Sequence, residues 1–144
     1  MTTKALFRAL DALKQDRSLT LSSVPDGFDA LVVADLARTL KGVVEGAAVL
    51  VHVSRDGQRQ QTLQNALAFV APELELLSFP AWDCQPYDRT SPNAGITAQR
   101  MTTLARLARS RTSEERPRVL LTTVNAAVQR VPPAASTPWP LRAS

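Results

Sequence analysis

Residues suited to cross-linking or metal binding are scarce in this sequence. Among its 144 residues there is one cysteine, Cys84, and one histidine, His52. A single cysteine excludes an internal disulfide, and no cysteine and histidine cluster has the spacing of a zinc site. Low cysteine usage is typical of proteins of the reducing cytosol, so we expect a cytoplasmic chain that binds no metal.

Long apolar runs are also missing. No stretch approaches the roughly 20 apolar residues of a membrane-spanning helix. The first 16 residues are amphipathic and charged, which is unlike a secretory signal. With 44% hydrophobic and 21% charged residues, the composition is that of a globular domain.

A working phosphate loop is absent as well. Such a loop needs Gly-x-x-x-x-Gly-Lys-Ser/Thr, in which glycines let the backbone approach the phosphates and lysine binds them. In an α/β domain it would follow the first strand. The turn after the first predicted strand carries Asp26, Gly27 and Asp29 and no lysine. Two carboxylates there would repel a triphosphate, so we expect no nucleotide cofactor and no nucleotide hydrolysis.

Charge is unevenly distributed along the chain. The net charge is +4, yet residues 1–99 hold nine Lys and Arg against eleven Asp and Glu, whereas residues 100–130 hold seven Arg against two Glu. Arginine suits planar contacts with phosphate or carboxylate, so the basic segment could face nucleic acid or an acidic protein. A solvated helix face explains the same pattern, and the two interpretations stay open.

Hydrophobic periodicity predicts alternating helices and strands. Helices are expected at about 3–16, 28–41 (ending at Gly42), 56–69 (capped by Asp56) and 91–109 (capped by Ser91), with a helical turn at 125–130. Strands are expected at about 18–22, 47–53, 74–79 and 119–124. The second of these is apolar except for His52, which is typical of a parallel strand buried on both faces and makes His52 a core residue. The alternation predicts an α/β fold with a parallel sheet flanked by helices.

The most distinctive stretch runs from Ser78 to Ala108. Its loop contains Trp82 and Tyr87, which could stack on nucleobases or could pin the loop onto the domain. Cys84 has no predicted histidine partner for nucleophilic catalysis. Its acidic residues are explained by turn caps or local ion pairs, so no catalytic residue is predicted.

Two blocks of the sequence resemble the N-terminal region of bacterial transcription-repair coupling factors. The first combines an aromatic-x-x-Trp-Asp loop and a Pro-Tyr-Asp step with a Ser-Pro helix start and an Arg-Met-x-Thr-Leu helix. The second reads Val-Asn-x-x-x-Gln-Arg-Val. Matching residues of the first block are Phe79, Trp82, Asp83, Pro86, Tyr87, Asp88, Ser91, Pro92, Arg100, Met101, Thr103 and Leu104. Those of the second are Val124, Asn125, Gln129, Arg130 and Val131.

This resemblance implies a fold similar to the first domain of excinuclease component B, the helicase-like loader of nucleotide excision repair. That domain is RecA-like and P-loop NTPase-like, and its phosphate loop would be degenerate here, with Asp26, Gly27 and Asp29 at that position. The connection from Phe79 to Ser91 is too short for the hairpin that component B inserts between DNA strands. In the family, ATP and Mg²⁺ serve a C-terminal DNA translocase that displaces stalled RNA polymerase, and a second N-terminal domain recruits excinuclease component A.

We therefore expect an incomplete first domain at residues 1–131 and a disordered tail or severed linker to a missing second domain at 132–144. The resemblance implies a scaffold and regulatory role in transcription-coupled nucleotide excision repair, without catalysis by this chain. Its partners would be the remaining domains of the parent protein and, through them, excinuclease component A, RNA polymerase and DNA. The alternative is a stand-alone nucleic-acid-binding module that uses residues 100–130. Candidate contacts for a partner or DNA are Trp82, Tyr87, Arg89, Arg100, Arg106 and Arg109.

Overall fold

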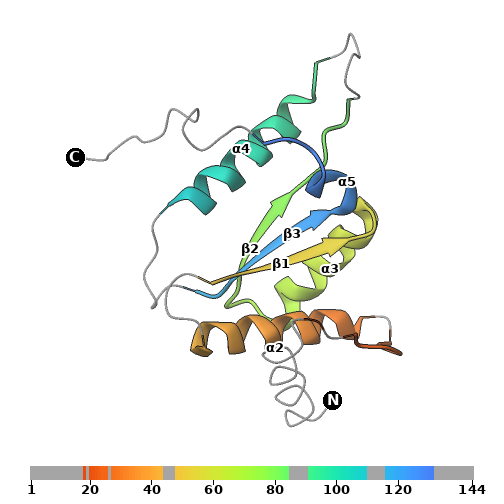
Figure 1. The fold of residues 1–144 in the computed structure, drawn as a ribbon, viewed down its shortest axis with the longest axis vertical. Helices are drawn as coiled ribbons and strands as arrows, with labels where there is room; N and C mark the ends of the chain where they lie inside the picture. Colours follow the sequence, from red (N-terminus) through yellow and green to blue (C-terminus); the bar gives the residue numbers. More distant parts are fainter. Residues whose placement is uncertain are drawn as a thin grey trace, which may run out of the picture.

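The computed structural model describes residues 18, 20–25, 27–43, 48–84, 91–109 and 116–131. Its elements in chain order are α2 (Phe28–Val43), β1 (Val49–Ser54), α3 (Gly57–Val70), β2 (Glu75–Phe79), α4 (Ala94–Ala108), β3 (Arg118–Thr123) and α5 (Val124–Ala127). Figure 1 shows the strands side by side with helices packed around them. The predicted first helix and the predicted tail, 132–144, lie outside the described residues.

The described strands form one parallel sheet in the order β1-β3-β2. β3, the last of the described strands, lies in the centre, with Leu120 opposite both Val51 and Leu77. The α/β class and the parallel sheet flanked by helices are confirmed. Because β3 inserts between the two earlier strands, residues far apart in sequence meet at the carboxyl edge of the sheet.

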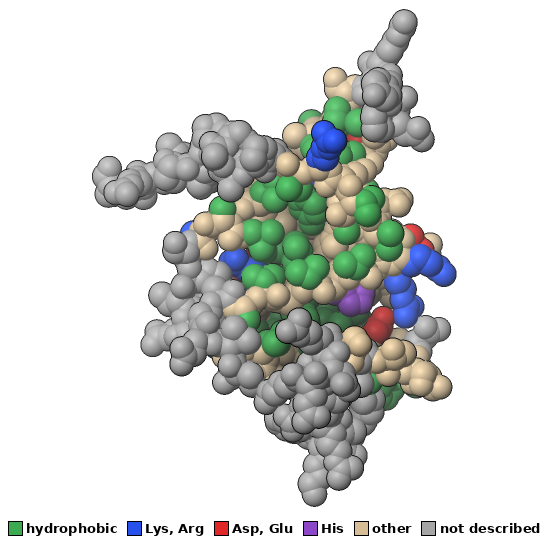
Figure 2. All heavy atoms as spheres, in the orientation of Figure 1, with side chains coloured by type: hydrophobic (Ala, Val, Ile, Leu, Met, Phe, Trp, Pro, Cys, Tyr) green, Lys and Arg blue, Asp and Glu red, His purple; other side chains and the backbone are tan. Residues whose placement is uncertain are grey.

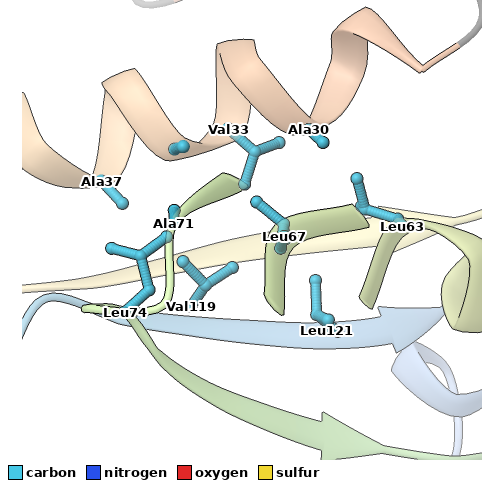
Figure 3. Close-up of a cluster of buried hydrophobic side chains, with 10 residues drawn as sticks. Ala30, Val33, Ala37, Leu63, Leu67, Ala71, Leu74, Val119 and Leu121 are labelled. Atoms are coloured by element: carbon cyan, nitrogen blue, oxygen red, sulfur yellow. The ribbon is translucent and has the colours of Figure 1, made fainter. Parts of the chain in front are cut away.

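One face of the sheet carries the main core. α2 turns a stripe of small residues toward it, which lets the helix approach α3 and the sheet closely. Leu63 and Leu67 of α3 and Val119 and Leu121 of β3 fill the space below, and each is at most 2% exposed. Figure 3 shows these side chains pointing toward one another between α2 and β3.

The opposite face is only partly covered, and this corrects a prediction. α4 packs along β2, where the Thr103 hydroxyl donates a 2.6 Å hydrogen bond to the Ser78 carbonyl. No described helix covers β1 on this face, so Val51 and Val53 are 53% and 47% exposed. The expectation that β1 is buried on both faces is therefore wrong. A continuous apolar run shows which strand can be buried, but not whether a helix covers it.

Three local predictions also need correction. Ser18 and Thr20–Ser22 are not in a strand, so no described strand leads into the turn before α2. Helix α2 continues past Gly42 to Val43. Helix α4 is capped by Asn93 rather than Ser91, because the Asn93 side chain accepts a 2.8 Å hydrogen bond from the Gly95 amide.

Helix α3 follows its prediction closely. The Asp56 carboxylate accepts a 2.8 Å hydrogen bond from the Arg59 amide and caps the helix. The other end stops at Val70, directly before Ala71 and Pro72. Among the described residues, no helix combines the length and the apolarity that crossing a membrane requires.

Candidate functional site

Arg100 lies at the centre of the distinctive Ser78–Ala108 stretch. Its guanidinium carbon is 4.1 Å from the ring centroid of Phe79 and 4.3 Å from that of Trp82. Both distances are within the range of cation–π attraction. Phe79 ends β2, Trp82 lies in the following loop, and Arg100 projects from α4, so the stacking joins three successive segments.

Hydrogen bonds complete this arrangement. Arg100 Nη1 donates to the Pro80 carbonyl at 2.6 Å and to Gln129 Oε1 at 3.3 Å. The same Gln129 oxygen accepts from the Trp82 amide at 2.8 Å. We call Phe79, Trp82, Arg100 and Gln129 the arginine clamp. Each member belongs to one of the two sequence blocks described above, so the clamp brings the two blocks together in space.

The clamp is built for structure rather than for an external anion. Arg100 is 2% exposed, and burial lowers the pKa of its guanidinium from the ordinary value. A buried guanidinium whose faces are covered by aromatic rings cannot meet a phosphate backbone at the surface. Its burial argues against the predicted contact of Arg100 with a partner or DNA, which stays a prediction.

Other arginines of the basic segment also serve the fold. Arg118 is 2% exposed, lies 2.9 Å from the Glu75 carboxylate and donates to the Arg106 carbonyl at 2.9 Å. Arg116 donates to the Glu73 carbonyl at 2.8 Å and to the Pro72 carbonyl. The side chains of Arg106, Arg109 and Arg130 lie at the surface. Among the described arginines of the segment, Arg100 and Arg118 are thus withdrawn from the surface, whereas Arg116 is exposed as well.

The remaining predicted contacts divide into two groups. Trp82 is half-buried in the clamp, and the neighbouring Asp83 carboxylate accepts a 3.1 Å hydrogen bond from the Asn93 amide, which ties the loop to the start of α4. This agrees with the interpretation of Asp83 as a turn residue. Tyr87 and Arg89 lie outside the described residues.

The start of α2 is the predicted position of the degenerate phosphate loop. Gly27 adopts a left-handed φ of 86°, which directs the chain into the helix. Asp29 Oδ1 accepts a 3.0 Å hydrogen bond from the Ala30 amide, and its Oδ2 lies 3.1 Å from Arg59 Nη2 of α3. The chain's own carboxylate therefore stands at this helix N-terminus, as Asp56 does at α3. Asp26 lies outside the described residues.

His52 and Ser54 are the described residues nearest to a nucleophilic arrangement. His52 Nδ1 lies 3.3 Å from Ser54 Oγ, but Ser54 is 2% exposed and cannot meet a substrate. Partial burial lowers the pKa of His52, which agrees with a role on the core face of β1. Cys84 is a half-buried free thiol. In the part of the chain that the structure describes, no group of three or more His, Cys, Asp and Glu residues could hold a metal ion.

An apolar groove on the partly covered face is the feature that sequence reasoning missed. Its volume is about 280 Å³, and it lies between α4 and β1 with α5 nearby. Its lining residues are Val51, Val53, Phe79, Leu104, Leu107, Leu120, Thr122, Ala126, Ala127, Gln129 and Val131. None of them is charged. Figure 2 shows hydrophobic side chains gathered over the strands on this face. Val51 and Val53 of β1 could have indicated this groove in the sequence, but the strand was predicted to be buried on both faces.

Comparison with known proteins adds one relative. The chain is 31% identical over 84 residues to a transcription-repair-coupling factor from Rickettsia prowazekii (strain Madrid E). This match supports a relation to transcription-repair coupling factors. The alignment covers 58% of the present chain and 7% of the relative, so the chain corresponds to a small part of that protein. No family model matches the sequence, and no solved structure matches the chain.

Proposed function

We propose that this chain is a scaffold and regulatory domain related to the N-terminal region of transcription-repair coupling factors. The observation that carries the proposal is the arginine clamp, because the two sequence blocks behind the resemblance meet in it. The 31% identity to a transcription-repair-coupling factor supports the same relation. The chain would act in transcription-coupled nucleotide excision repair, in the cytoplasm, as part of a larger parent protein.

In this proposal the chain is a RecA-like domain with a degenerate phosphate loop, and it neither binds ATP nor catalyses a reaction. Asp29 supports this, because its carboxylate accepts the Ala30 amide hydrogen bond in the first turn of α2 and pairs with Arg59 where a phosphate would otherwise receive backbone amides. ATP and Mg²⁺ would be bound elsewhere in the parent, whose translocase would engage DNA and RNA polymerase. Recruitment of excinuclease component A would also depend on the parent.

Titration calorimetry with Mg²⁺-ATP tests the absence of nucleotide binding. The full chain is expected to show no saturable heat at micromolar to millimolar ATP and no phosphate release. Asp29→Asn removes the carboxylate without changing the size of the side chain, and it is also expected to stay inactive, because the turn still has no lysine. Saturable micromolar binding by the unmodified chain would overturn the degenerate-loop proposal.

A second candidate is direct nucleic-acid binding through the arginines that do lie at the surface. Arg106 and Arg109 lie near the end of α4, and Arg130 follows α5. If they bind phosphates, affinity for DNA should fall steeply as salt rises from about 50 to about 200 mM, as phosphate contacts generally require. An Arg106→Glu/Arg109→Glu variant should then lose binding. Arg100 is left intact in this variant because its change would disturb the fold.

A further inference from the structure

The face of the sheet that α4 covers only in part has room for one more helix. Parallel sheets in α/β proteins are almost always covered by helices on both faces. Here α2 and α3 cover one face, whereas on the other face α4 packs on β2 and leaves Val51 and Val53 of β1 about half exposed. The apolar groove of about 280 Å³ lies in this uncovered strip, between α4 and β1.

Helix α4 is held over β2 and does not close the groove itself. The Thr103 hydroxyl donates a 2.6 Å hydrogen bond to the Ser78 carbonyl, and Arg100 stacks on Phe79 at the end of the same strand. Packed helices lie about 8–10 Å apart, so a helix that covers β1 would lie beside α4 and share the groove with it. The occupant that this architecture favours is therefore helical.

Charge around the groove indicates which kind of helix fits. The elements α4, β1, β3 and α5 contain no Asp or Glu. Arg106 lies on α4 between two lining leucines, Arg130 lies between the lining residues Gln129 and Val131, and both arginines are exposed. Figure 2 shows hydrophobic side chains in the centre of this face and basic side chains at its borders. An uncharged lining next to exposed arginines is complementary to an apolar surface flanked by carboxylates.

We propose that the groove binds an amphipathic helix of another protein, with an apolar stripe flanked by acidic residues. The stripe covers the valines of β1 and the leucines of α4, and the acidic flanks lie beside Arg106 and Arg130. Helices that bind in grooves use apolar anchors three or four residues apart in this way. A nucleic acid fits less well, because its charged backbone gains nothing from an apolar lining. The inference uses only the described residues and does not depend on the relation to coupling factors.

The first test titrates synthetic peptides into the full chain and follows methyl NMR. The acidic probe has about 18 residues, enough to form a helix in water, with leucines every three or four residues and glutamate or alanine elsewhere. One control peptide has lysine in place of each glutamate, and another has the same composition with its leucines scattered around the helix. Only the acidic probe should shift the methyl resonances of Val51, Val53 and Leu120 with a Kd below about 1 mM. Those of Leu63 and Leu67, in the core on the other face, should stay unchanged.

Three results of this titration would overturn the proposal. The first is equal binding of the acidic and basic peptides, or no saturable shift with the acidic one. The second is a shift of the groove methyls that grows with protein concentration alone, which would assign the groove to a second copy. The third is a shift of the same methyls by short duplex DNA but not by the acidic peptide, which would assign the groove to nucleic acid.

The second test changes the groove and its arginines separately. Val53→Asp places a carboxylate in the lining and should weaken binding of the acidic peptide at least about tenfold. Val128→Asp adds the same charge at an 80% exposed position outside the lining and should change binding by less than about twofold. Arg106→Glu/Arg130→Glu should reverse the preference, so that the basic peptide binds more tightly than the acidic one. Equal effects of the two aspartates, or an unchanged preference in the double variant, would contradict the proposal.

Discussion

At the scale of single residues, Arg100 shows how a functional pattern and a structural one can look alike in sequence. An arginine on a helix next to a loop rich in aromatic residues is a reasonable candidate for nucleic-acid binding. In the fold, the same aromatic rings cover its guanidinium, and Gln129 from the second sequence block accepts its hydrogen bond. All four residues of the arginine clamp were identified in the two sequence blocks, but the sequence could not show that their side chains contact one another.

Replacing Arg100 with lysine should therefore destabilise the domain. Lysine keeps the charge but loses the planar group that stacks on two rings. We expect a loss of about 1–3 kcal/mol in the free energy of unfolding, from weakened cation–π contacts and a lost charged hydrogen bond. Urea denaturation followed by circular dichroism measures this. Arg106→Lys, on the exposed side of the same helix, should change stability by less than about 0.5 kcal/mol. Equal losses in the two variants would contradict the structural role of the clamp.

His52 predicts a specific dependence of stability on pH. Burial lowers its folded-state pKa below the ordinary value of 6.5, Asp29 acts in the opposite direction, and Arg59 adds to the lowering. The unfolded chain therefore takes up a proton at higher pH than the folded chain. The contribution of neutral His52 to stability is present above the unfolded-state pKa of about 6.5 and is lost as the pH falls below it through the lowered folded-state pKa.

His52→Gln should flatten this dependence between about pH 7.5 and about pH 5.5, the range around the ordinary histidine pKa. Because the pKa values of Asp56 and Glu73 are also lowered, the free energy of unfolding decreases further as the pH is lowered, but these carboxylates protonate in a more acidic range than His52. Urea midpoints measured at half-unit steps provide the comparison. If the unmodified chain and the His52→Gln variant gave parallel profiles of urea midpoint against pH over this range, His52 would have no such role.

At the scale of elements, the regions with strong periodicity were predicted well. Helix α3, with its Asp56 cap and its Leu63 and Leu67 core face, was predictable because each local signal agreed with the others. The start of α4 was displaced by two residues because Ser91 and Asn93 are both good caps. The choice between them depends on Asp83, ten residues earlier, which binds the Asn93 amide. Such a contact cannot be read from local sequence.

Thr103 gives a prediction at this scale, since it fastens α4 to β2. Thr103→Val keeps the shape of the side chain but removes its 2.6 Å hydrogen bond to the Ser78 carbonyl. We expect a loss of about 1–2 kcal/mol in the free energy of unfolding. Thr102→Val changes the same atoms at an exposed position of the same helix and serves as the matched control. The assigned attachment of α4 is wrong if both variants unfold at the same denaturant concentration.

At the scale of the whole molecule, strand alternation was enough to predict a parallel α/β sheet, but not its order or its coverage. The insertion of β3 between β1 and β2 follows from pairing between strands that are distant in the sequence. Local propensity carries no information about such pairing. The exposure of Val51 and Val53 on the partly covered face could not be predicted for the same reason, because α4 packs on β2 and leaves β1 uncovered. The degenerate phosphate loop and the domain boundaries remain predictions.

The measurement that most directly tests the proposed role uses the relative itself. The 84 residues of the Rickettsia prowazekii protein that align with this chain are exchanged for the matching residues of this chain, and ATP turnover is compared with that of the intact protein and of a protein lacking the aligned region. A scaffold and regulatory domain should keep turnover in the chimera within about twofold of the intact protein, whereas the deletion changes it. A correctly folded chimera with the turnover of the deletion protein would contradict the proposed role.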